Sequence, residues 1–264
     1  MTQSNILTKK RLWFGLILLL IILLIARIPA IWAAYAFTQA APGLRMSEIN
    51  GTLWTGRSGS TQIILGGDLY SLGELSWSLH PTSLLTLTPC ADIKVSFQNQ
   101  NAAGLACVSS SGAVTLSDFE ANFPAGLTNL FSPTQLAGNF SVIISEGDFD
   151  GEHVKAIDGS VSWREGAFHD GEKWLRVGSF GARLSGDGQQ GINIDLQDLG
   201  GPVLVDLDAN YNPTLRPNDD VGILFTGEVG VRDSAHPDLA TILPTMAASV
   251  GEPSDNGYRI SWSF

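Results

Sequence analysis

Residues 192–207 read INIDLQDLGGPVLVDL, two runs of alternating apolar and polar side chains separated by a glycine-rich turn. Alternation with a period of two places the apolar residues on one face of a strand and the polar residues on the other. The pattern recurs at residues 74–79, 93–97 and 159–163, with Gly, Asn, Asp and Ser turns between the runs. The sequence therefore predicts an all-β, antiparallel body of short strands, forming an extended or groove-like sheet.

Two stretches interrupt the alternation. Residues 119–131 and 236–246 are predicted to form short helices or ordered loops, and the second has helical spacing of leucine and isoleucine until Pro244. No low-complexity linker divides the chain, so residues 38–264 are predicted to form one domain, with a seam near Ser132 and Pro133.

The amino terminus carries the longest apolar run. Residues 12–26 contain no polar side chain, and the apolar character resumes after Arg27 as far as residue 37. Lys9, Lys10 and Arg11 precede the run, and no acidic residue precedes Glu48. The positive-inside rule then predicts a cytoplasmic segment (1–11), a transmembrane anchor (12–37) and a periplasmic β domain (38–264), a single-pass protein of the bacterial inner membrane.

Arg27 is expected near the far interface, where its guanidinium reaches the headgroups. The alternative for this region is a cleavable signal peptide, because Ala34, Tyr35 and Ala36 form a small-x-small cleavage pattern behind a basic segment. An apolar run that continues beyond Arg27 favours the anchor.

The body of the protein is acidic. Beyond residue 37 there are 26 acidic and 11 basic side chains, an excess of 15 negative charges. Such a surface repels phosphate backbones and anionic headgroups, so a nucleic-acid partner is excluded and a solvated domain is predicted.

The only two cysteines, Cys90 and Cys107, lie in successive strand-like segments. A disulfide joining neighbouring strands is expected in an oxidising compartment, and a loop of this size contributes about 3 kcal/mol to stability. Two unconnected buried thiols are the alternative.

Nothing in the sequence nominates a catalytic or metal site. The four histidines, His80, His153, His169 and His236, lie beside turn residues and match no catalytic or metal-binding motif. The acidic run at 148–152 lacks the distal ligands of a calcium loop and is predicted to be a hairpin turn. We therefore expect no enzymatic activity, no cofactor and no small-molecule substrate.

The last residues, 258–264, alternate strictly and end in Phe, as many outer-membrane barrels do. The runs are too short and too acidic for a barrel, which needs about ten residues per strand with an apolar outer row. We expect a terminal strand paired with the sheet.

Several segments resemble one family. These are RIPA at 27–30, APGL at 41–44, EINGTLWTG at 48–56 with Gly51, Trp54 and Gly56, and LSWSLHP at 75–81 with Trp77 and Pro81, followed by two leucines at 84 and 85. An apolar helical piece at 239–243 precedes the final strand. The chain is similar over nearly its whole length to the N component of the bacterial type II (general) secretion pathway, GspN.

The resemblance implies a non-enzymatic, inner-membrane-anchored accessory subunit that supports export of folded proteins from the periplasm across the outer membrane. Its partners would be other type II secretion components, the inner-membrane platform or the secretin. From the residues themselves, residues 51–54 are predicted to be a strand that buries Trp54, and Trp77 a strand residue ahead of the stop at Pro81.

A second hypothesis is a periplasmic β-groove protein that binds or transfers lipid. It requires an apolar concave surface, and alternation alone does not distinguish a groove from a closed core.

Overall fold

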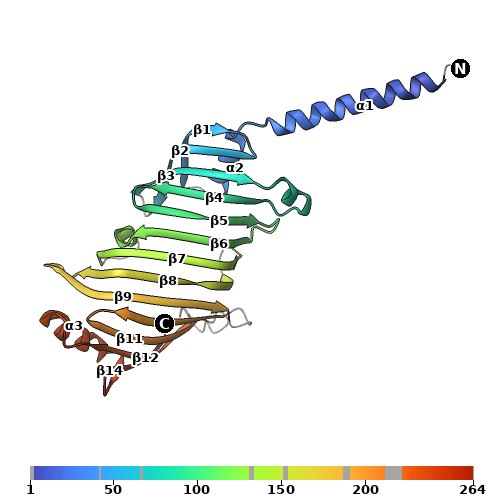
Figure 1. The fold of residues 1–264 in the computed structure, drawn as a ribbon. Coiled ribbons are helices and arrows are strands. Elements are labelled where there is room, and N and C mark those ends of the chain that lie inside the picture. Colours follow the sequence, from blue (N-terminus) through green and yellow to red (C-terminus); the bar gives the residue numbers. More distant parts are fainter. Residues whose placement is uncertain are drawn as a thin grey trace.

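The computed structural model describes residues 3–41, 43–65, 68–130, 134–150, 154–186, 191–211 and 222–263. In these ranges the chain forms one fourteen-stranded antiparallel sheet whose strands lie side by side in sequence order, except that β14 lies between β12 and β13 (Figure 1). The strands are β1 (Leu44–Gly51), β2 (Thr55–Leu65), β3 (Asp68–Leu79), β4 (Cys90–Phe97), β5 (Gln100–Val108), β6 (Val114–Pro124), β7 (Leu136–Phe149), β8 (Val154–His169), β9 (Trp174–Gly186), β10 (Ile192–Gly200), β11 (Val203–Tyr211), β12 (Ile223–Val231), β13 (Gly251–Ser254) and β14 (Gly257–Ser263). The helical elements are α1 (Gln3–Ala26), α2 (Ile31–Ala40), α3 (Pro237–Ala247) and the 3₁₀ turns η1 (Pro81–Thr86) and η2 (Ala125–Leu130).

The amino-terminal apolar run is divided into two helices. α1 ends at Ala26 and α2 begins at Ile31, with Pro29 between them. Proline removes a main-chain donor and clashes with the preceding helical turn, so the segment predicted as the anchor, residues 12–37, consists of two helices and not one. α1 projects away from the sheet, whereas α2 lies beside β1 to β3 (Figure 1).

The two faces of the sheet differ in chemistry. Cross-strand pairing places Val142, Val161, Ala182, Leu196 and Leu207 in one row across β7 to β11. The neighbouring row, one residue along each strand, consists of Ser141, Ser162, Gly181, Gln197 and Asp206. Successive residues point to opposite faces, so the first row belongs to an apolar face and the second to a polar face.

No second sheet covers the apolar face within the described residues, since all fourteen strands belong to one sheet. The protein exposes 16906 Å². A globular monomer of the same mass exposes about 11,000 Å². α1 and the open faces of the sheet account for the larger area, so most apolar residues of the body are only half-buried.

Several local predictions differ from the structure. The strands are longer than expected, up to the 16 residues of β8. Residues 119–124, expected to be helix or loop, belong to β6, and helical turns begin only at η2. The helix expected at 236–246 is confirmed as α3, but Pro244 lies inside it and does not end it.

Other predictions concern the connections. Ser132 and Pro133, where a seam was expected, lie outside the described residues, and the sheet continues across this point because β6 pairs with β7. Residues 151–153 of the expected acidic turn are also outside the described ranges. The carboxy-terminal run is confirmed as a paired strand, β14, which lies between β12 and β13.

Candidate functional site: the apolar face of the sheet

Aromatic rings form a continuous row in the middle of the apolar face. Phe123, Phe140, Trp163 and Phe180 come from four successive strands, β6 to β9, and face one another in register. Neighbouring ring centroids lie 5.6 to 5.8 Å apart, and the Phe140 and Trp163 rings are stacked with an interplanar angle of 16°. The Trp163 indole N–H donates to the Ala137 carbonyl at 3.0 Å, which fixes the ring in the row. This arrangement leaves an aromatic surface without a polar atom directed outward.

The apolar face is hollowed toward the carboxy-terminal end. A cavity of about 880 Å³ lies between α3 and strands β8, β9, β11, β12 and β14. Its walls include Trp163 and Phe180 from the aromatic row, Leu207 from β11 and Phe225 from β12. Thr134 and Ser249 are its only polar lining residues among the described residues, and no charged side chain lines it. This volume and apolar lining are typical of a ligand pocket.

The hollow continues along the sheet. A second cavity of about 310 Å³ shares Trp163 and Phe180 with the first and extends to Phe140, Leu196 and Val205. Every described side chain that lines it is apolar. The two cavities therefore form one apolar groove that runs from β7 to β14, which we call the apolar groove below.

α3 forms one wall of the apolar groove. Pro237 is its first residue, and the His236 ring nitrogen accepts from the Asp238 N–H at 3.3 Å, so the amino terminus of the helix is capped. Leu239 is 1% exposed and packs against Val177 and Val203 of the sheet. The apolar stripe of α3 thus faces the sheet, as its helical spacing requires.

An ion pair connects α3 to the β8–β9 hairpin. The Lys173 ammonium contacts the Asp238 carboxylate, and this contact raises the pKa of Lys173 above its ordinary value. In the same hairpin, Asp170 accepts the N–H groups of Glu172 and Lys173 at 2.8 Å each. Those donors hold the pKa of Asp170 below its ordinary value.

The residues of the sequence motif meet at the other end of the sheet. Gly51 pairs with Gly56, and Gly56 pairs with Trp77, so the three lie side by side on β1, β2 and β3. Trp77 is 3% exposed, donates its indole N–H to the Leu53 carbonyl at 3.1 Å, and meets Phe37 of α2 edge-on. A side chain at residue 56 would overlap the Trp77 ring, which explains the glycine there.

The prediction that residues 51–54 form a strand burying Trp54 is wrong. β1 ends at Gly51, and the chain turns there because Gly51 has a φ of 102°. Trp54 is half-buried, and its indole N–H donates to the Ile25 carbonyl at 2.9 Å. The side chain therefore connects the end of α1 to the first hairpin and is not a core residue.

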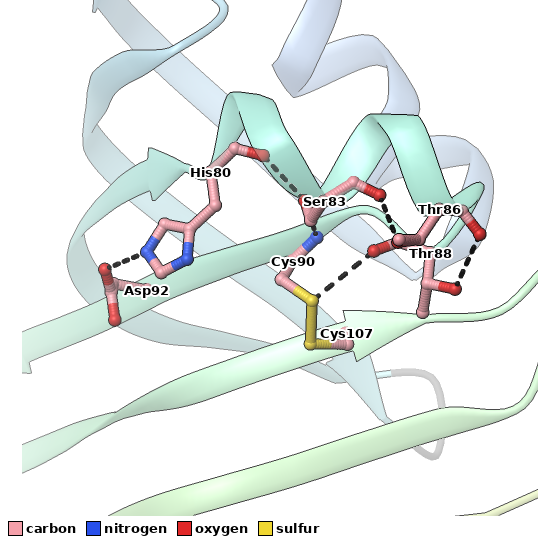
Figure 2. The surroundings of a disulfide bond; sticks show 7 residues. All are labelled: His80, Ser83, Thr86, Thr88, Cys90, Asp92 and Cys107. Carbon is pink, nitrogen blue, oxygen red and sulfur yellow. Dashed lines mark hydrogen bonds and ion pairs between the residues drawn. A yellow bond between two sulfur atoms is a disulfide. The ribbon is translucent and has the colours of Figure 1, made fainter.

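Pro81 and the cysteines lie on the next connection. β3 ends at Leu79, and Pro81 begins η1, so proline follows the strand as expected. Cys90 and Cys107 are paired across β4 and β5 and form the predicted disulfide. Figure 2 shows that Ser83 connects η1 to this pair, because its hydroxyl donates to the His80 carbonyl at 2.6 Å and accepts from the Cys90 N–H at 2.9 Å.

The polar face carries like charges in register. Asp195 and Asp208 lie opposite each other on β10 and β11. A hydrogen bond with Asp195 raises the pKa of Asp208, and the nearby charges of Asp195 and Asp206 add to this shift. Among the described residues, no three His, Cys, Asp or Glu side chains are grouped closely enough to hold a metal ion.

The residues predicted to set membrane orientation lie on α1 and directly after it. The side chains of Lys9, Lys10 and Arg11 are outside the described set, and Arg27 is exposed just beyond the end of α1. The described apolar residues of α1 are exposed too, from 46% at Ile25 to 73% at Phe14. In the part of the chain that is described, no helix reaches the length and hydropathy of a membrane span.

Comparison with known families agrees with this architecture. The family described as "Type II secretion system (T2SS), protein N" matches residues 42–261, which include β1 to β13 and most of β14. The chain belongs to this family. The match begins after α2, so it rests on the sheet and α3 and not on the amino-terminal helices. Neither the curated proteins nor the solved structures gave a match to the chain.

The sequence motifs marked the amino-terminal end of the sheet, whereas the apolar groove at the other end was not assigned residue by residue. Trp163, Phe180, Leu207 and Phe225 are ordinary strand residues by sequence. The signal that could have found them is the alternation itself. It places apolar side chains on one face of many strands, and the described helices are too few to cover that face.

Proposed function

We propose that this type II secretion protein is a non-enzymatic accessory subunit, anchored in the inner membrane, that supports export of folded proteins across the outer membrane. Residues 1–11 lie in the cytoplasm, the anchor falls within residues 12–37, and the sheet extends into the periplasm. Its partners are other components of the secretion system, the inner-membrane platform or the secretin.

The observation that carries this proposal is the family match over residues 42–261. Three features support the anchor, its orientation and the periplasmic location of the sheet. The described apolar side chains of α1 are exposed, and Lys9, Lys10 and Arg11 precede the apolar run. The Cys90–Cys107 disulfide suits an oxidising compartment such as the periplasm.

The sheet is suited to assembly and not to chemistry. Its two edge strands differ: β1 has eight residues, whereas β13 has four and contains Pro253. A short edge strand with proline resists pairing with another chain, while a longer one offers main-chain donors and acceptors. We therefore propose β1, the edge next to the anchor, as the contact with other inner-membrane components.

Deletion of the gene tests the proposal. Proteins that use this secretion route should accumulate in the periplasm and disappear from the medium, and a plasmid copy should restore them. Outer-membrane permeability, measured by leakage of a periplasmic marker, is the control and should not change. Normal secretion in the deletion strain would reject the proposed role.

A further inference from the structure

We propose that the apolar groove binds the acyl chains of membrane phospholipids. This inference rests on the membrane anchor of the proposed function but not on a role in secretion, because it is argued from the chemistry of the groove walls and from the end of α1 at which the apolar face begins.

The walls select for a ligand without hydrogen-bonding groups. The cavity of about 880 Å³ is lined by apolar side chains except for Thr134 and Ser249, and the Ser249 hydroxyl already donates to the Met246 carbonyl at 2.6 Å. A peptide strand would bring one N–H and one C=O per residue into these walls, and unpaired main-chain groups are costly to bury. A hydrocarbon chain brings none, so it matches a wall of Trp163, Leu207 and Phe225.

The groove offers a continuous path for a flexible chain. The cavity beneath α3, of about 880 Å³, continues along the sheet into the second cavity of about 310 Å³, and Trp163 and Phe180 line both. A hydrocarbon chain can follow this surface from one cavity into the other.

The position of the sheet makes the membrane the source of the ligand. The apolar face begins where α1 ends, at the Trp54 to Ile25 hydrogen bond and the packing of Ala30 and Ala33 against Trp77. From there the face is continuous: Leu75 pairs with Val95, Val95 with Ala102, and Ala102 with Ala121. Ala121 pairs with Val142, and the row of paired apolar residues continues from Val142 to Leu207, which lines the groove.

Charge defines the type of lipid. The sequence beyond residue 37 has an excess of 15 negative charges, which repels anionic headgroups. The polar face, with Asp195, Asp206 and Asp208, carries part of this charge. A zwitterionic phospholipid, whose headgroup remains outside the groove, fits both the walls and the surroundings.

Photocrosslinking of the full-length protein in living bacterial cells tests the inference. A benzophenone amino acid replaces Phe225, which lines the groove, and in a matched control it replaces Thr226, which points to the opposite face and is exposed. Phospholipids are labelled with radioactive phosphate before irradiation. Phe225 should acquire phosphate label several-fold above Thr226, and phospholipase C should remove it.

A second pair guards against a variant that fails to fold. Trp163 lines both cavities and Ser162 lies on the opposite face, so the same comparison applies. Only variants whose hydrogen exchange in β8 to β12 matches that of the wild-type protein are scored. Equal labelling of the two members of both pairs would overturn the inference.

Three further results would also overturn it. Crosslinks from the groove positions to a protein would make the groove a protein interface. In a parallel experiment, radioactive acetate labels the acyl chains of all lipids. Acetate label without phosphate label, or phosphate label that phospholipase C does not remove, would mean that the ligand is not a phospholipid.

Discussion

Replacing Trp77 by alanine should cost about 3–5 kcal/mol of local stability, the range for removing a buried aromatic side chain. Trp77 is 3% exposed, meets Phe37 edge-on at 5.6 Å and donates to the Leu53 carbonyl. Truncation would empty the space between α2 and β3 and leave the Leu53 carbonyl without this donor. The loss should be confined to the first strands, because each strand contacts mainly its neighbours.

Trp54 and Trp174 are the matched controls. Trp54 is half-buried and makes one hydrogen bond, to Ile25, so its truncation should cost about 1–2 kcal/mol. Trp174 is 49% exposed, and its truncation should cost less than about 1 kcal/mol.

Native-state hydrogen exchange of the full chain measures the opening free energy peptide by peptide. The exchange of β1 to β3 should quicken far more in Trp77→Ala than in Trp54→Ala, while β10 to β12 remain unchanged. Equal losses for Trp54 and Trp77 would refute the difference in burial on which this reasoning rests.

Three further predictions follow from single contacts. Replacing both Cys90 and Cys107 by serine should lower the stability of β4 and β5 by about 3 kcal/mol, because the bridge closes a loop with a sequence separation of 17; hydrogen exchange measures this, and free thiols in the native protein would contradict it. Asp208→Asn should raise the melting temperature at pH 7. The pKa of Asp208 is raised above 3.8, so its contribution to stability is complete below pH 3.8 and is lost as the pH rises through the raised pKa, where Asp208 becomes an anion beside Asp195. Asparagine carries no charge and avoids this loss. Melting curves at pH 7 and below pH 3.8 check this, and a gain in melting temperature that persists below pH 3.8 would show that charge is not the cause. Lys173→Met should free the amino terminus of α3 and quicken its hydrogen exchange, an effect that high salt should mimic in the wild-type protein but not in the variant.

The all-β class, the disulfide, the terminal strand and the family could be predicted because each depends on local pattern. Alternation defines strands wherever large apolar and polar residues succeed one another. It failed at residues 119–124, where the apolar positions are Phe119, Ala121 and Phe123. The small Ala121 weakened the alternation, although pairing with Val142 places it on the apolar face.

Strand length was underestimated for a related reason. In β8 the register shifts between Trp163 and Gly166, and Glu165 has a φ of 53°. A bulge shifts the alternation by one residue, so a long strand looks in sequence like two short ones with a turn between them. Similar register shifts occur in β7.

The apolar groove could not be predicted because a groove and a closed core use the same residues. Whether Leu196 or Val205 faces a second layer depends on the topology of the whole sheet and not on its neighbours in sequence. The break between α1 and α2, in contrast, depends on local sequence. Pro29 ends the helical hydrogen bonding within the apolar segment, so this break could have been predicted from a single residue.

Taken together, the two proposals make the apolar face, and not the polar face, the surface on which the function of this protein depends. Complementation of the deletion strain tests it with two variants that place the same charge on opposite faces of β10: Leu196→Glu on the apolar face and Gln197→Glu on the polar face. Both must reach wild-type levels and keep the wild-type hydrogen exchange of β9 to β11. We predict that Gln197→Glu restores the secreted proteins to the medium and that Leu196→Glu does not. Equal restoration by both variants would contradict this.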